Sequence, residues 1–373
     1  MKTRRLRMKK VLVYSILLFC LSHTAFSGGK DDTKLSKTIT KSFAVPPNGN
    51  VRIVNKYGNI VINTWNKDSV KAEIKITVWG KNDKNVDKMM RRVDFDFIQS
   101  TRYLEMVTVL DRSSGFFAEI WNNIGDYSKT LLNQNKLRIE YIIYMPEHLD
   151  LEIENKFGDI YFQEYKGRLR INLSHGNIRA TKFSQLDLDL SFGNADIKSI
   201  GDGVFNLKGT ECSFPSIGNG QITSSSSEIR IKEISFLKMF SNSDRKFIVE
   251  KADEIQGSSN FSKIEINQVS DAVRIEMNYG VLEMGKIDPG FTSIDVTGKN
   301  TPITIEFTKG ASFDLIVEGK EDRITIPNES SLKKSYQNER DNLVTFTGRI
   351  GISDQTGSVI IRSGNGDIKI IID

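Results

Sequence analysis

The chain has 373 residues, with 52 Lys and Arg against 47 Asp and Glu, so its formal net charge is +5. Six of the basic residues and no acidic residue lie in the first 27 positions, which leaves the rest of the chain at −1. Because the remaining Lys and Arg are interspersed with Asp and Glu, the composition argues against a nucleic-acid-binding protein.

Met1–Ser27 has the three parts of a secretory signal peptide. A basic start is followed by an apolar run from Val11 to Leu21 and by Ala25-Phe26-Ser27, a small-x-small cleavage site. A membrane anchor is the alternative, but these eleven residues fall short of the roughly 20 that span a bilayer. We expect export across the inner membrane, a periplasmic or cell-surface location, and no transmembrane span after cleavage. Only Cys212 would remain, so no internal disulfide could form.

We expect a flexible segment over residues 28–36, followed by a strand-rich N-terminal region over residues 37–148 that contains two insertions. The first insertion, residues 82–93, has Val86, Met89 and Val93 at helical spacing. This pattern predicts a short amphipathic helix, which we expect to cap an open end of the sheet.

The second insertion, residues 113–134, is unusually aromatic, with Phe116, Phe117 and Trp121. Two interpretations are open. The apolar helical face packs against the sheet as core, or it projects as a patch that contacts a protein, a glycan or a membrane surface. In the second case, Phe116, Phe117 and Trp121 are the candidate partner-binding residues.

Residues 149–310 repeat at intervals of 16 to 18 residues. Each unit has two stretches of alternating apolar residues joined by a turn, and alternation with period two predicts strands with one buried face. We interpret each unit as one coil of a single-stranded β-solenoid, with about 18 residues per coil; an antiparallel meander is the alternative. In the solenoid register, Asp187 lies above Arg170 and Asp189 above Asn172. The units begin at Leu169, Leu186, Val204, Gln221, Leu237, Ile255, Val273 and Phe291.

A short motif marks the turn in many coils, as in the near-duplicates N-K-Y-G-N-I from Asn55 and N-K-F-G-D-I from Asn155. We expect the Gly-Asn and Gly-Asp pairs to supply positive φ at a tight corner. The aromatic residues before these pairs lie an even number of positions from the buried residues of the same strands. We therefore expect their rings to point inward and to pack in the corner. A ladder of rings that binds sugar by stacking is the alternative. The corner residues are Gly58, Gly158, Gly176, Gly193 and Gly280, with Tyr57, Phe157, His175, Phe192 and Tyr279 before them.

Two regions depart from this pattern. In the coils over residues 221–236 and 237–254, Ser and charged residues replace the corner Gly, so we expect irregular coils there. Residues 311–373 resume the strand pattern and are expected to close the far end, with a long loop over residues 328–341.

We identify no catalytic residues, cofactor site or metal site in the sequence, since His and Cys are nearly absent. Asp187 and Asp189 are the best carboxylate pair for a polysaccharide-active β-helix enzyme. With Arg170 beneath Asp187, a solvated face is the simpler interpretation.

The chain resembles the bacterial exported "putative adhesin" proteins, also called toast-rack or head-domain β-solenoids. The likeness lies in F-A-V-P-P-N-G-N-V-R-I-V-N-K-Y-G-N-I-V-I from Phe43 and I-E-Y-I-I-Y-M-P from Ile139, and in the later Gly-Asn and Gly-Asp coils. The resemblance implies an all-β fold, an envelope or surface location and no known enzymatic activity, and it supplies no functional residues.

Our leading hypothesis is therefore a non-enzymatic adhesin-like or scaffold protein that binds an envelope protein or glycan. The alternatives are a polysaccharide-active enzyme and a component of an envelope-stress response, which the genetic neighbourhood of some resembling proteins implies.

Overall fold

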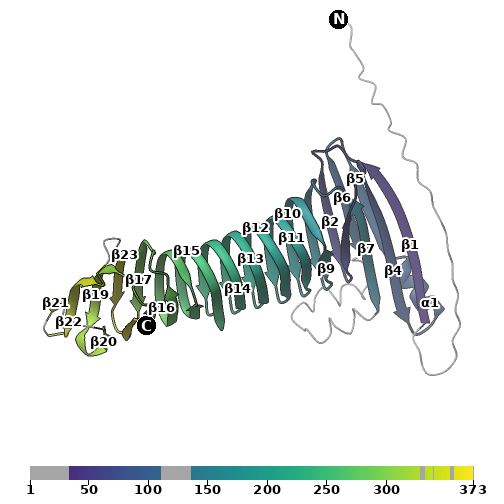
Figure 1. The fold of residues 1–373 in the computed structure, drawn as a ribbon. Coiled ribbons are helices and arrows are strands. Elements are labelled where there is room, and N and C mark those ends of the chain that lie inside the picture. The colour runs from purple at the N-terminus through teal and green to yellow at the C-terminus, as the bar shows by residue number, and fades with distance from the viewer. Residues whose placement is uncertain (1–32, 111–135, 328–331, 339, 353–356, 373) are drawn as a thin grey trace, which may run out of the picture.

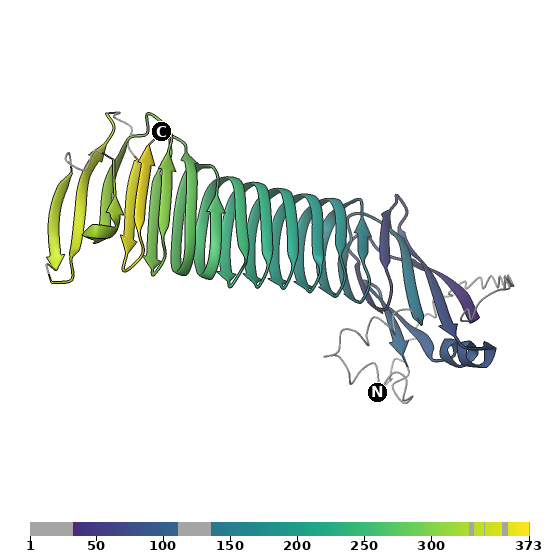
Figure 2. The same cartoon turned by 90° about the horizontal axis from the view of Figure 1, so that it is seen from below.

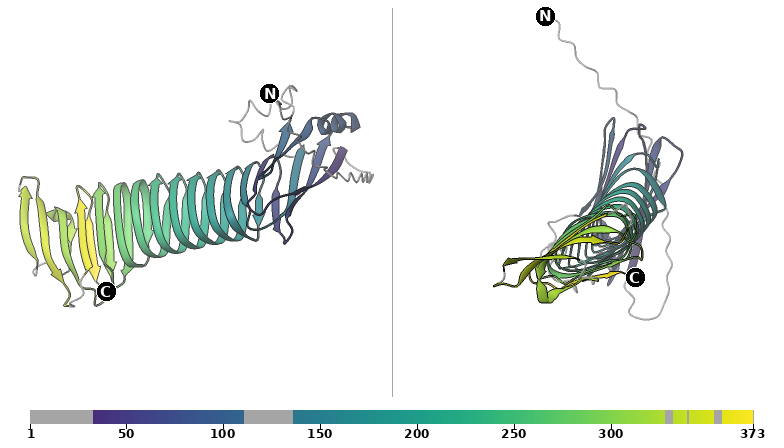
Figure 3. Two further views of the ribbon diagram at one scale, coloured as in Figure 1. Left: turned by 90° about the horizontal axis from the view of Figure 1, so that it is seen from above. Right: turned by 60° about the vertical axis from the view of Figure 1, so that its left-hand side comes forward.

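The structure is a computed structural model, and it describes residues 33–110, 136–327, 332–338, 340–352 and 357–372. These residues form a long rod of stacked β-coils, all joined in one continuous system of 24 strands (Figures 1 and 2). Figure 3 shows the coils lying one behind another along a single axis. The all-β solenoid that the sequence predicts is confirmed.

The central part of the rod consists of parallel coils. Each strand pairs in parallel with the strand of the next coil, as β10 does with β11 and β11 with β12. This parallel pairing excludes the antiparallel meander. The strands are β8 (Asp150–Lys156), β9 (Ile160–Phe162), β10 (Glu164–Ser174), β11 (Ile178–Ser191), β12 (Asn194–Lys208), β13 (Glu211–Ser225), β14 (Glu228–Asn242), β15 (Lys246–Ile266) and β16 (Val269–Ile287).

The register is more regular than the sequence suggests. From Leu169 the paired positions advance by 17 residues through Leu186, Gly203, Gly220 and Leu237, and then by 18 through Ile255 to Val273. The irregularity expected over residues 221–254 is therefore wrong for most of this range, and the register shifts only between Ala252 and Glu254.

Three predicted unit starts are also wrong. Gly203 and Gly220 occupy the positions assigned to Val204 and Gln221. Ile294 occupies the position assigned to Phe291, because it pairs with Val273. A Cβ on Gly203 would lie 2.3 Å from the ring of Phe205, so this ring fills the space that a side chain at position 203 would need. Val204 instead points outward and is 50% exposed.

The N-terminal end is built from strands that extend the two faces of the solenoid. The first of them begins at Thr33, so the flexible segment expected to reach residue 36 is wrong over residues 33–36. On one face the order is β1-β4-β7-β3-β9, and on the other it is β5-β6-β2-β8. The coil of β2 and β3 therefore lies directly on that of β8 and β9, although about 100 residues separate them in the chain. The strands are β1 (Thr33–Ala44), β2 (Asn50–Lys56), β3 (Ile60–Thr64), β4 (Ser69–Gly80), β5 (Val93–Gln99), β6 (Tyr103–Leu110) and β7 (Leu137–Met145).

The helix predicted in residues 82–93 is confirmed as α1 (Asp83–Met90). Asn82 is its N-cap, and the Asn82 side chain accepts a hydrogen bond from the backbone N–H of Asn85 at 3.0 Å. Val86 and Met89 are buried, and the helix contacts β4 and β1, which form the N-terminal end of one face (Figure 1).

At the C-terminal end, the last strands of the chain are inserted between earlier ones. β23 lies between β17 and β19, and β24 lies between β18 and β20. The predicted loop over residues 328–341 contains a strand, β21, so that part of the prediction is wrong. The elements are β17 (Ser293–Lys299), β18 (Ile303–Phe307), β19 (Phe313–Lys320), the 3-10 turn η1 (Glu321–Arg323), β20 (Ile324–Thr325), β21 (Lys333–Asn338), β22 (Leu343–Ile350), β23 (Gly357–Ser363) and β24 (Ile368–Ile372).

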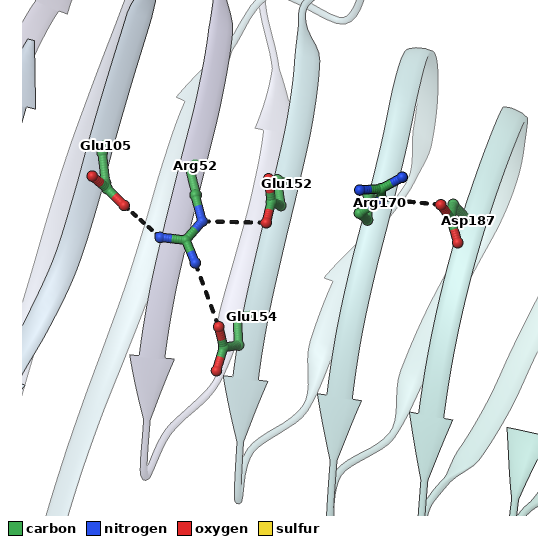
Figure 4. Close-up of polar contacts among 6 residues, drawn as sticks. All are labelled: Arg52, Glu105, Glu152, Glu154, Arg170 and Asp187. Atoms are coloured by element: carbon green, nitrogen blue, oxygen red, sulfur yellow. Dashed lines mark hydrogen bonds and ion pairs between the residues drawn. The ribbon is translucent and has the colours of Figure 1, made fainter. Parts of the chain in front are cut away.

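The outward face carries ion pairs between neighbouring strands. Asp187 lies above Arg170 as predicted, with Nε of Arg170 3.0 Å from Oδ2 of Asp187 (Figure 4). Nearer the N-terminal end, Arg52 contacts three carboxylates, those of Glu105, Glu152 and Glu154 (Figure 4).

Candidate functional site: an aromatic corner

Aromatic side chains stack along one corner of the rod. Tyr57, Phe157, His175 and Phe192 follow one another in adjacent coils, with ring centroids 5.5, 5.1 and 5.1 Å apart and planes within 10° of parallel. Farther along, Phe261 and Tyr279 stack at 5.0 Å and 2°. We call this row of positions the corner ladder.

All members of the corner ladder share one backbone conformation. Their φ values lie between 54° and 61°, in the left-handed region that non-glycine residues seldom adopt. Between Phe192 and Phe261, the equivalent positions are Gly209, Ser226 and Ser243, with φ of 60°, 52° and 56°. The corner thus keeps its geometry through coils in which the ring is missing.

The prediction that these rings point inward is wrong for much of the ladder. Tyr57 is 5% exposed, but Phe192 is 54%, Tyr279 43% and Phe261 61% exposed. Strand alternation assigns an inward direction because it assumes extended backbone on both sides. A left-handed residue turns the chain and resets this alternation, so the ring points outward although Leu190, two residues earlier, is buried.

The corner glycines are needed for space, and only Gly280 among them also has a positive φ, of 134°. A Cβ on Gly158 would lie 2.0 Å from the carbonyl oxygen of Gly58, and one on Gly193 would lie 1.8 Å from that of Gly176. Neighbouring coils therefore approach each other too closely here for any side chain.

Side chains after the glycines hydrogen-bond from coil to coil. The backbone N–H of Asp159 donates to Oδ1 of Asn59 at 2.9 Å, and that of Asn177 donates to Oδ1 of Asp159 at 2.8 Å. The N–H of Asn194 continues this series, donating to Oδ1 of Asn177 at 3.1 Å. The Asn and Asp of the motif thus satisfy corner N–H groups, a role that the sequence interpretation missed.

From Thr210 to Ser262, buried side-chain oxygens replace the glycines and accept these hydrogen bonds, and glycine returns at Gly280. The N–H of Thr210 donates to Oγ of Ser227 at 3.2 Å, that of Ser227 to Oδ1 of Asp244 at 2.8 Å, and that of Asp244 to Oγ of Ser262 at 2.9 Å. Asp244 also accepts from the hydroxyls of Ser224 and Ser241 at 2.5 and 2.6 Å. The coils that look degenerate in sequence are thus a second type of corner.

Two open grooves follow the corner ladder. The larger, about 920 Å³, extends from Phe157 and Phe192 across Gly209 and Ser226 to Arg245. The other, about 420 Å³, lies beside Tyr57, Phe157 and the Asn59–Asp159 step of the Asn series.

Two titrating groups of the ladder have shifted pKa values. Burial raises the pKa of Tyr57 to about 12, so its hydroxyl stays protonated at physiological pH. Burial and, second, the positive charge of Lys156 lower the pKa of His175 below 6.5. His175 is therefore a neutral ring between two phenylalanine rings at neutral pH.

The other sequence candidates lie elsewhere. Phe116, Phe117 and Trp121 fall outside the described residues, so their partner-binding role remains a proposal. Asp187 pairs with Arg170, and Oδ2 of Asp189 accepts from the Asn206 amide at 3.2 Å. Both carboxylates therefore take part in contacts between coils.

Phe261 is a ladder residue that the sequence interpretation missed, because Ser262 and not Gly follows it. Its position 18 residues before Tyr279 is the signal that could have identified it.

Within the described residues, no three His, Cys, Asp or Glu side chains gather in a way that could hold a metal ion. None of the helices in the described part of the chain has the length and apolarity needed to cross a membrane.

No protein-family model and no curated protein matches the chain. Solved structures do align with it. A "putative adhesin" from Parabacteroides merdae is 12% identical, with 90% of this chain and 96% of that chain covered and a TM-score of 0.34. One from Bacteroides fragilis is 12% identical, with 90% and 97% covered and a TM-score of 0.24. A "putative cell adhesion protein" from Clostridium sporogenes is 13% identical, with 90% and 100% covered and a TM-score of 0.19. The solved structures that align with this chain thus include proteins named as adhesins, the class that its sequence motifs resemble.

Proposed function

We propose that this chain is an exported, non-enzymatic β-solenoid that binds a protein or glycan of the cell envelope through its aromatic corner. The signal-like sequence of Met1–Ser27 supports export. Location in the periplasm or at the cell surface is part of the same proposal.

The observation that carries the proposal is that aromatic rings of the corner ladder point outward from residues whose backbone is in the left-handed region. A non-glycine residue in the left-handed region costs on the order of 1–3 kcal/mol. Burial of the ring would offset this cost, yet Phe192 and Phe261 are more than half exposed, at 54% and 61%. A conformation that recurs from coil to coil and leaves apolar rings in water is typical of a contact surface.

The scaffold suits this role because it holds the rings in fixed relative positions. Each ring is attached to a corner whose N–H groups bond to the next coil, as the N–H of Phe192 does to the carbonyl of Lys208 at 3.0 Å. A partner that binds several rings therefore meets a preorganised surface and loses little affinity to ordering of the protein.

Binding of the chain without Met1–Ser27 to immobilised cell-envelope fractions tests the proposal. The Phe192→Ala, Phe261→Ala double variant should lose most of the binding. Phe240→Ala should keep it, since Phe240 is 38% exposed on β14 and does not line the corner grooves.

A triple Ala variant at Phe116, Phe117 and Trp121 tests the second candidate surface in the same assay. If this variant alone loses binding, the partner contacts the insertion and the aromatic corner is not the site. If the wild type binds no envelope fraction, the proposed function is wrong. Cell fractionation with surface proteolysis tests the location separately.

A further inference from the structure

The corner ladder is interrupted at three consecutive coils. Gly209, Ser226 and Ser243 occupy the positions between Phe192 and Phe261 and keep the positive φ of the ladder. Their N–H groups continue the same bonds, from Gly209 to the carbonyl of Ser225 at 2.9 Å and from Ser226 to that of Asn242 at 3.1 Å. The backbone therefore has the same conformation here as at the aromatic positions, but the side chains have no rings. We call this stretch the ladder gap.

The ladder gap is bounded by the rings of Phe192 and Phe261. Phe192 stacks on His175 and Phe261 stacks on Tyr279, each on the side away from the gap. Adjacent strands are about 4.8 Å apart, so the four steps from Phe192 to Phe261 separate the two rings by roughly 19 Å. Within this distance, the missing side chains leave an open groove.

The floor of the gap is polar. Glu211, Glu228 and Arg245 line it, and Nε of Arg245 donates to Oε2 of Glu228 at 2.8 Å. The hydroxyls of Ser226 and Ser243 are at the exposed ladder positions themselves. A ligand in the groove therefore meets the apolar ring of Phe192 at one end and hydrogen-bonding groups as far as Arg245, and Phe261 lies one coil beyond.

This combination fits a pyranose ring better than other ligands. The C–H groups on one face of a pyranose carry partial positive charge and pack on the negative face of an aromatic ring, while its hydroxyls need polar partners. A lipid chain or an apolar peptide would leave the Glu211 and Glu228 carboxylates desolvated at a cost. Two carboxylates against one guanidinium disfavour a polyanionic glycan.

We propose that the ladder gap binds an uncharged pyranose glycan, with sugar rings stacked on the open faces of Phe192 and Phe261. This inference rests on the proposed function and specifies the ligand class and the place on the corner. Glu211, Glu228 and Arg245 hydrogen-bond the sugar hydroxyls.

The gap can be tested by filling it. Ser226→Phe adds the missing middle ring, and the backbone tolerates this, because φ of 52° at Ser226 is close to the 57° and 56° of Phe192 and Phe261. Thr223→Phe is the matched control, since Thr223 is an exposed residue three positions earlier in the same coil and does not line the gap. Circular dichroism establishes that each variant is folded.

Isothermal titration with cellotetraose and chitotetraose, as neutral probes, and with polygalacturonate oligomers, as an anionic probe, gives the readout. We expect the wild type and Thr223→Phe to bind at least one neutral probe. Phe192→Ala should weaken this binding about tenfold, as expected for one lost ring contact, and Ser226→Phe should abolish it. If Ser226→Phe does not fold, the affinities of the Phe192→Ala and Phe261→Ala variants for the neutral probes decide whether the ladder gap is the binding site.

Three outcomes would overturn the inference: Ser226→Phe and both Ala variants bind like the wild type, the anionic probe binds more tightly than the neutral ones, or no neutral probe binds. If the wild type still binds envelope fractions in these cases, the proposed function stands and only the glycan site is wrong. If it binds neither, both fail.

Discussion

Gly158 lies so close above Gly58 that a Cβ on Gly158 would be 2.0 Å from the Gly58 carbonyl oxygen. We therefore expect Gly158→Ala to lower the free energy of unfolding by about 1–3 kcal/mol, as forced overpacking does. Gly290→Ala is the control, because no atom lies within 4 Å of a Cβ there. Urea unfolding of both variants gives the comparison. Equal stabilities would show that the coils can separate at little cost.

The second type of corner depends on a buried carboxylate. Asp244 is 2% exposed and accepts hydrogen bonds from Ser224, Ser241 and the N–H of Ser227. Asp244→Ala leaves these buried donors without their acceptor, so we expect a loss of at least about 2 kcal/mol in unfolding free energy. Asp196→Ala, at an exposed position, should change it by less than about 0.5 kcal/mol. Similar losses for the two variants would contradict this role of Asp244.

His175 should make stability depend on pH. The pKa of His175 in the folded protein is lower than its ordinary value of 6.5. Between the folded-state pKa and pH 6.5, the unfolded chain therefore binds more protons than the native protein. This contribution is present above pH 6.5 and is lost as the pH falls toward the pKa of the folded state. We expect His175→Phe to lose less Tm than the wild type between pH 7.5 and 5.5. Identical slopes of Tm against pH would show that His175 titrates normally.

Cys212 should be inert to thiol reagents in the folded protein. It is buried, and this burial raises its pKa to about 11, so little reactive thiolate exists at pH 8. Labelling by Ellman's reagent should be slow in buffer and fast in guanidinium chloride. Fast labelling of the native protein would mean that the coil around Cys212 opens readily.

The two ion-pair sites in Figure 4 should contribute differently to the free energy of unfolding. Arg170 and Asp187 form an exposed pair, so Arg170→Met should cost less than about 1 kcal/mol. Arg52→Met leaves the carboxylates of Glu105, Glu152 and Glu154 close to one another, and Glu105 is only 16% exposed. We expect this variant to cost about 1–3 kcal/mol. A smaller cost for Arg52→Met than for Arg170→Met, measured by urea unfolding, would refute the ranking.

The sequence predicts the strands of the coils well, because apolar residues alternate with polar ones wherever a strand has one buried face. It places Asp187 above Arg170 correctly, since the repeat length fixes the register. It fails at Gly203, where the space is filled by Phe205 from two residues away. It also misses β21, whose residues are all exposed and therefore show no alternation.

The candidate site is harder to predict because it depends on one backbone angle. The alternation of buried and exposed residues along the strand predicts that the Phe192 ring points inward, whereas the φ of 57° at Phe192 turns the ring outward. The ladder gap shows a related limit. Gly209, Ser226 and Ser243 are small residues that carry no ring, and only the register identifies them as positions of the corner ladder.

A crystal structure of the chain soaked with a neutral tetrasaccharide tests the central claim most directly. We expect density for a pyranose ring packed flat on the face of Phe192 or Phe261, with hydroxyls near Glu211, Glu228 or Arg245. A sugar bound away from the corner ladder, or a ladder gap still empty at saturating sugar, would contradict it.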